Sequence, residues 1–98
     1  MQYEVKMKTG FFETTRYFLS AASGGIALCP AEDKSKAGIH VPEDEIIDIM
    51  LIQEKYAAIE IKTCHRTISG IFTKNLDLRD VHSELRKYIK KDVIYVEI

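Results

Sequence analysis

"IEIKTCHRTISGIF", residues 59–72, is the stretch that decides the fold, because it predicts a β-hairpin. Apolar and polar residues alternate on both sides of Cys64 and His65, with the period of two that strands with one buried face show. The pairs expected to share one face are Ile61 with Ile68, Ile59 with Gly70, and Ala57 with Phe72. Cys64-His65 lacks the Asn-Gly or Asp-Gly of the tightest turns, so a four-residue loop is favoured over a two-residue loop.

Alternating patterns and turn signals predict further strands upstream of this hairpin. The strand candidates are 2–9, 12–22, 26–29, 39–41, 46–52, 56–63 and 67–72. The part between 43 and 58 allows two interpretations. Pro42 followed by three acidic residues is a good helix start, so the alternative is an α+β fold with a second helix near 43–56. The β-branched residues that favour a strand instead are Ile46, Ile47, Ile49 and Ile52.

After Asn75 the apolar period changes to that of a helix. Leu78, Val81 and Leu85 recur at three- and four-residue steps, which predicts an amphipathic helix near residues 77–90. Asp77 is the expected N-cap, and basic residues in the last turn complement the helix dipole. Residues 93–98 then form a β-prone tail that must either join the chain's own sheet or pair with another copy.

Length and composition set the limits of what the chain can be. Its 98 residues, 46% hydrophobic and 30% charged, suit one globular domain spanning 1–98. A net charge of -1 provides no general attraction to nucleic acid or to anionic lipid. The sequence contains no long apolar run, so we expect no signal peptide and no transmembrane helix. The expected location is therefore the cytoplasm. Two cysteines suggest free thiols, with Cys29 as a small buried hydrophobe.

Three segments together resemble the small bacterial pleckstrin-homology and GRAM-like domains. They are "GIHVPEDEIIDIMLIQEKYAAIEIKT" (38–63), "TISGIFTK" (67–74) and "LRDVHSELRKYI" (78–89). The resemblance implies a mainly β fold: an antiparallel barrel of about seven strands, closed at one end by a C-terminal helix. It also implies a binding or scaffolding role without catalysis. Lipid-binding members carry basic residues around the first two strands, but here Tyr17-Phe18 follows Arg16 where a second basic residue would be needed.

Catalytic and metal-binding patterns are not found in the sequence. Cys64 and His65 are neighbours in a predicted turn, where adjacent side chains diverge. The histidines and cysteines show no metal-ligand spacing, and the acidic run 43–45 is typical of a solvated turn. The sequence therefore predicts a protein that is not an enzyme and needs no metal or cofactor.

The candidate binding residues lie in two places. Phe11 and Phe12 are apolar residues flanked by the cations Lys8 and Arg16, and the tail contributes Val93 and Tyr95. The leading hypothesis is a binding or scaffold module for a protein partner, which a second copy of the chain could provide. The alternatives are a peripheral module for membrane headgroups and a small enzyme using Cys64. Nucleic acid is not an expected partner, and a membrane is disfavoured by the charge balance.

Overall fold

The elements follow one another along the chain almost as predicted. The computed structural model describes residues 2–8, 14–32 and 37–98. The elements of these parts are β1 (Gln2–Lys8), β2 (Thr14–Ala22), β3 (Gly25–Pro30), β4 (Ile39–Pro42), the 3₁₀ turn η1 (Glu43–Glu45), β5 (Ile46–Gln53), β6 (Ala57–Thr63), β7 (Thr67–Phe72), α1 (Leu78–Tyr88) and β8 (Asp92–Glu97). The prediction of a mainly β fold with a C-terminal helix is confirmed, and the eighth strand, β8, is the predicted β-prone tail.

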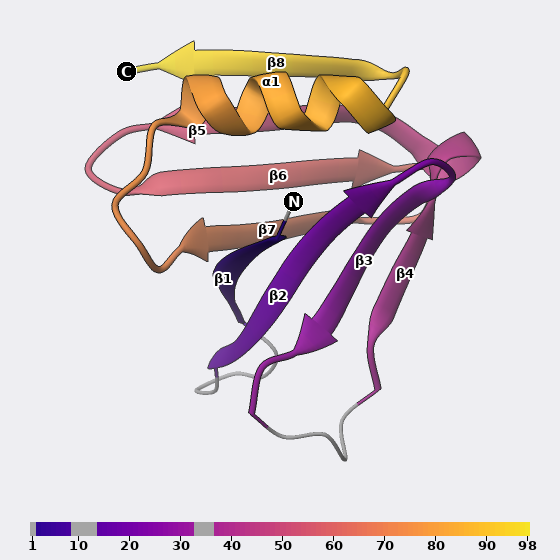
Figure 1. Cartoon of the computed structure of the whole chain (residues 1–98), viewed down its shortest axis with the longest axis horizontal. Helices are drawn as coiled ribbons and strands as arrows, with labels where there is room; N and C mark the ends of the chain where they lie inside the picture. Colours follow the sequence, from indigo (N-terminus) through magenta and orange to yellow (C-terminus); the bar gives the residue numbers. More distant parts are fainter. Residues whose placement is uncertain (1, 9–13, 33–36) are drawn as a thin grey trace.

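The described strands form one open sheet in the order β4-β3-β2-β1-β7-β6-β5-β8. Neighbouring strands are antiparallel except β5 and β8, which are parallel. Strands β2, β3 and β4 run obliquely to β6 and β7, so the sheet bends, and α1 lies across the part formed by β5 and β8 (Figure 1). Within the described residues, the end strands β4 and β8 have no bonding between them, so a closed barrel stays a prediction.

The core lies between the bent sheet and α1. Every strand turns alternate side chains inward, and α1 adds its apolar stripe. The fully buried large side chains are Leu19, Ile26, Leu28, Ile46, Ile49, Leu51, Ile61, Leu78, Leu85, Val5 and Val81. Burial of this apolar surface is the main force that holds the helix on the sheet.

The alternative of a second helix near 43–56 is wrong. Only Glu43–Glu45 turns, as one 3₁₀ turn, and β5 begins at Ile46. A bulge between Ile46 and Asp48 adds one residue to β5 relative to β6, so that both Ile46 and Ile49 face the core while Ile47 is exposed. Strand β5 pairs with β6 on one side and β8 on the other, and its inward-facing β-branched residues Ile46 and Ile49 are thereby buried in the core.

The hairpin of β6 and β7 has the predicted register, with Ile61 opposite Ile68 and Ile59 opposite Gly70. The last ladder pair is Lys62 with Thr67, which leaves the four-residue loop that the sequence favoured. Inside the loop, the Thr63 N–H donates to the Arg66 carbonyl at 2.8 Å. The Thr63 hydroxyl oxygen also accepts from the backbone N–H groups of His65 and Arg66. These bonds hold the loop in one shape.

The predicted N-cap of α1 is confirmed. The Asp77 side chain accepts a bond of 2.9 Å from the Arg79 N–H, and it also accepts bonds from the Arg79 guanidinium. These bonds, first the side-chain bond and then the backbone bond, hold the pKa of the Asp77 carboxyl below its usual value because they stabilise the charged form.

We expect Asp77→Ala to lower the melting temperature by a few degrees, because it leaves an N–H of the first turn without a partner. Asp77→Asn keeps an oxygen acceptor and is the matched control. Because the folded pKa is depressed, the charge of Asp77 stabilises the fold above the unfolded pKa of about 4, and this contribution is lost as the pH falls through the folded value. When the pH is lowered from neutral to 3, the melting temperature should therefore fall less for Asp77→Asn than for the native chain. An equal loss would contradict this role.

Candidate functional site

The predicted cationic and aromatic surface is only partly within the described structure. Phe11 and Phe12 lie outside the described residues, as does the side chain of Lys8. Arg16 is exposed on β2 and forms ion pairs with Glu4, at 3.8 Å, and with Glu32. The Arg16 guanidinium thus lies beside two carboxylates, with which a lipid headgroup would have to compete.

The two predicted tail residues differ in their surroundings. The Val93 side chain is buried in the core, so it is not available at the surface. Tyr95 is half-buried and packs against the same core. The tail itself joins the chain's own sheet beside β5, the first of the two outcomes that the sequence left open. Its outward-facing residues, Ile94 and Val96, were not among the predicted binding residues.

The outer face of β8, β5, β6 and β7 carries two adjoining rows of side chains that are partly exposed. In the first row Val96 lies beside Ile52, followed by Ala58 and Ile71. In the second row Ile94 lies beside Met50. Ile94 is 42% exposed and Ile71 45% exposed. We call Met50, Ile52, Ala58, Ile71, Ile94 and Val96 the outer apolar patch.

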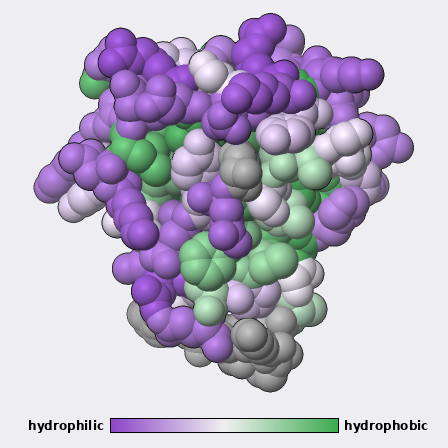
Figure 2. All heavy atoms as spheres, viewed as in Figure 1, coloured by the Kyte–Doolittle hydropathy of each residue, from purple (hydrophilic) through white to green (hydrophobic). Residues whose placement is uncertain are grey.

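An open hollow of about 430 Å³ adjoins this patch and shares Ile52, Ala58 and Ile71 with it. Lys6 and Glu60 add charge of both signs to its lining. On the opposite side of the sheet α1 lies over β5 and β8, and hydrophilic side chains occupy most of the surface around that helix (Figures 1 and 2). Hydrophobic side chains are also visible on this side, below the helix (Figure 2).

Strand β8 ends the sheet, so one of its edges has no neighbouring strand among the described residues. The Ile98 N–H donates to the Gln53 carbonyl, and by alternation the backbone groups of Val93, Tyr95 and Glu97 point away from β5. His82 on α1 covers one of them: its Nε2 lies 2.7 Å from the Val93 carbonyl oxygen and must donate, since a carbonyl only accepts. In the parts of the chain that the structure describes, no strand pairs with the edge at Tyr95 and Glu97, so another strand could add there.

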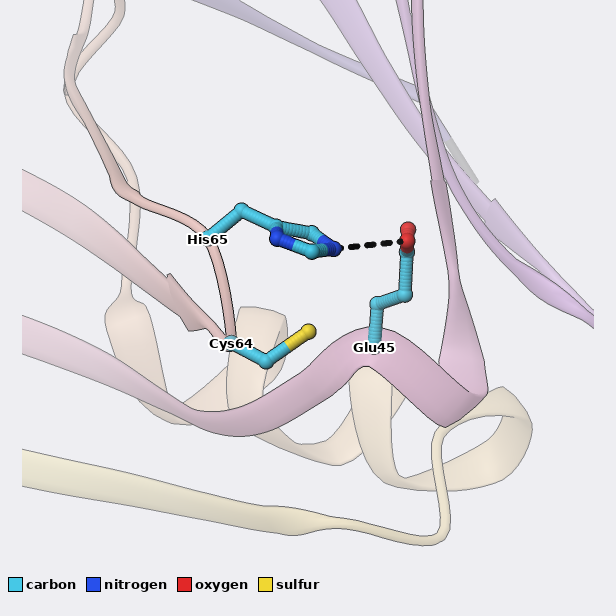
Figure 3. Close-up of side chains that lie close together, drawn as sticks. All are labelled: Glu45, Cys64 and His65. Atoms are coloured by element: carbon cyan, nitrogen blue, oxygen red, sulfur yellow. Dashed lines mark ion pairs between the residues drawn. The ribbon is translucent and has the colours of Figure 1, made fainter.

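Glu45, Cys64 and His65 come together at one end of the sheet, where η1 meets the β6–β7 loop. Their ligand atoms all lie within 4.8 Å of one another, and no other group of three such residues gathers in the parts of the chain that the structure describes. His65 Nε2 lies 3.4 Å from Glu45 Oε1. All three side chains extend into the same space (Figure 3). The interpretation of Cys64-His65 as an exposed turn is confirmed. The expectation that the two side chains diverge is wrong, because their ligand atoms converge, and the sequence did not reveal Glu45 as the third member.

The two cysteines are both free and exposed, so the interpretation of Cys29 as a buried hydrophobe is wrong. On β3 the side chain of Leu28 faces the core, and the alternation of the strand then turns Cys29 outward. Glu45, which the sequence placed in a solvated acidic turn, could have been linked to Cys64 only through the register of β5 with β6. That register pairs Ile46 with Thr63 and so makes their neighbours Glu45 and Cys64 adjacent.

No family model matches the chain, and no curated protein matches it in sequence. No helix in the described parts is long and apolar enough to cross a membrane. The features of the described residues that could support a function are the outer apolar patch, the edge of β8 and the Glu45–Cys64–His65 cluster.

Proposed function

We propose that this chain is a protein-interaction module without a catalytic role, and that its partner is a second copy that adds its own β8 to the open edge of the first. The observation that carries the proposal is the outer apolar patch, which extends to that edge through Ile94 and Val96. A partly exposed apolar patch and an open strand edge are each features that interfaces cover. Here the two features adjoin.

Pairing of the two edges would partly cover the members of the patch that lie on β8, Ile94 and Val96, and this burial favours association. The remaining exposed surface of Ile94 contributes on the order of 1 kcal/mol if it is removed from water. Both copies bring the same residues, so a two-fold interface doubles each contribution. Backbone hydrogen bonds between the two edges set the register of the paired strands, but they add little net binding free energy.

The charges of β8 select the register of this pairing. An antiparallel pair centred between Ile94 and Tyr95 would place Asp92 of one copy opposite Glu97 of the other, which is repulsive. A pair centred on Tyr95 instead places Ile94 opposite Val96 of the other copy. This second register also matches the outward direction of the Tyr95 backbone groups, so it is the one we propose.

The test is the mass of the full chain in solution, measured by light scattering at increasing concentration. We expect a dimer for the native chain and a monomer for the double variant Ile94→Lys/Val96→Lys, because two lysines on the outer face of the edge strand repel their counterparts. Point variants are preferred to deletion of the tail, since deletion would also remove Val93 from the core.

Thr67→Lys is the matched control, because Thr67 is exposed on the outer face of β7, away from the edge. It should leave the dimer intact. Circular dichroism verifies that each variant is folded. A native chain that stays monomeric at every concentration rejects self-association, and a dimer that survives both lysines rejects the β8 edge as its contact.

A further inference from the structure

The three potential ligand side chains at the β6–β7 loop are held by backbone contacts that bring two separate segments together. The Cys64 N–H donates to the Glu45 carbonyl at 3.1 Å, directly beside the ladder pair of Ile46 and Thr63. The Thr63 hydroxyl orders the loop from inside. The backbone that carries the three ligands is therefore already ordered. Less conformational entropy is lost when an ion binds.

The observed separation of two of the ligand atoms suits a metal ion. With metal–ligand distances of about 2.0–2.1 Å and tetrahedral angles, the nitrogen and oxygen ligands of a zinc ion lie about 3.3 Å apart. His65 Nε2 and Glu45 Oε1 lie 3.4 Å apart. The Cys64 sulfur lies within 4.8 Å of both atoms. A zinc ion bound to all three would need this sulfur at the longer zinc–sulfur distance of about 2.3 Å, so the Cys64 side chain would have to move closer on binding.

The donor set selects the kind of ion. A thiolate, an imidazole and a carboxylate together favour a borderline-soft ion such as Zn²⁺ and disfavour Mg²⁺ and Ca²⁺, which take oxygen ligands. Without an ion, the cluster is an exposed pair of His65 and Glu45 beside a free thiol, which contributes little to stability. Exposure of Cys64 and His65 leaves room for water at a fourth position.

We propose that Glu45, Cys64 and His65 form a three-ligand Zn²⁺ site on the surface of each chain, with the fourth position open to water or to an external ligand. Binding releases the proton of the Cys64 thiol and replaces the contact between His65 and Glu45 with two metal bonds. The site is separate from the β8 edge and is independent of the self-association proposed above.

The test uses the full chain without a histidine tag, kept reduced by a phosphine, and titrates it with Co²⁺ as a coloured substitute for Zn²⁺. We expect one ion per chain, a thiolate-to-cobalt charge-transfer band, and the visible bands of a four-coordinate ion. Added Zn²⁺ should displace the cobalt and abolish both signals. Isothermal titration with Zn²⁺ alone gives the affinity.

Cys64→Ser should abolish the charge-transfer band, and His65→Asn and Glu45→Gln should each weaken Zn²⁺ binding at least about tenfold, since even indirect partners of a metal ligand change affinity by 10–100-fold. Cys29→Ser and His40→Gln are the matched controls, because both residues are exposed and belong to other strands. They should change neither signal.

Three results would overturn the proposal. The first is the absence of saturable binding, and the second is a charge-transfer band that survives Cys64→Ser. The third is a stoichiometry of one ion for two chains, which would mean that the ion bridges copies rather than occupying a site within one chain. Circular dichroism of each variant at the titration temperature confirms that loss of binding is not loss of fold.

Discussion

Leu85→Ala is expected to lower the free energy of unfolding by about 2–5 kcal/mol, the range for a fully buried leucine whose removal leaves a cavity. Leu85 is 0% exposed, and it lies on the apolar stripe by which α1 packs against the sheet. For a chain of 98 residues, each kcal/mol corresponds to about 4–8 °C in melting temperature, so the transition should move by about 10 °C or more. Urea denaturation monitored by circular dichroism measures the change.

Ser83→Ala is the control for this substitution, because Ser83 is exposed on the same helix. It should change the free energy of unfolding by less than about 0.5 kcal/mol. A loss below about 1 kcal/mol for Leu85→Ala would mean that α1 is not a structural part of the core and would contradict the packing described here.

Gly25→Ala is expected to lower the free energy of unfolding at least as much as Leu85→Ala does. The reason is a clash of backbone atoms. Gly25 has φ +146°. A Cβ atom at this position would come within 2.2 Å of the Val41 carbonyl oxygen. Because the obstacle is the backbone of β4, no side-chain rotation can relieve it, and the β3–β4 pairing must open.

Gly24→Ala separates the strain of a positive φ from the clash with the backbone of β4. Gly24 also has a positive φ, +109°, but a Cβ there would have nothing within 4 Å. It should show the conformational strain alone, of about 1–3 kcal/mol. We expect Gly25→Ala to lower the free energy of unfolding by about 1–3 kcal/mol more than Gly24→Ala, because this is the usual cost of overpacking. Equal losses in urea denaturation would show that the approach of β4 is not tight.

The features predicted well from the sequence are those in which the interacting residues are close along the chain. The register of β6 with β7 follows from a four-residue loop and an alternating pattern, and Asp77 caps a helix that begins at the next residue. These interactions are local, so the side-chain period and the turn chemistry contain nearly all the information needed.

Other features depend on residues far apart along the chain. The tail was predicted as a strand, but its pattern did not say whether it would join this sheet or another copy. It lies beside β5 because α1, packed on the core, returns the chain to that edge and buries Val93. Cys29 was placed on the wrong side because a short apolar run does not reveal which of its faces is buried.

The Glu45–Cys64–His65 cluster shows this dependence at the level of side chains. Glu45 and Cys64 are distant in sequence and show no motif spacing, yet the pairing of Ile46 with Thr63 makes them neighbours. That pairing requires the bulge at Ile46 and Asp48, without which the alternation would turn Ile46 out of the core. Local periodicity therefore specified the strands, whereas burial across the whole sheet set the register that brings these three side chains together. The reason is that the register of each strand depends on which residues all neighbouring strands must bury at the same time.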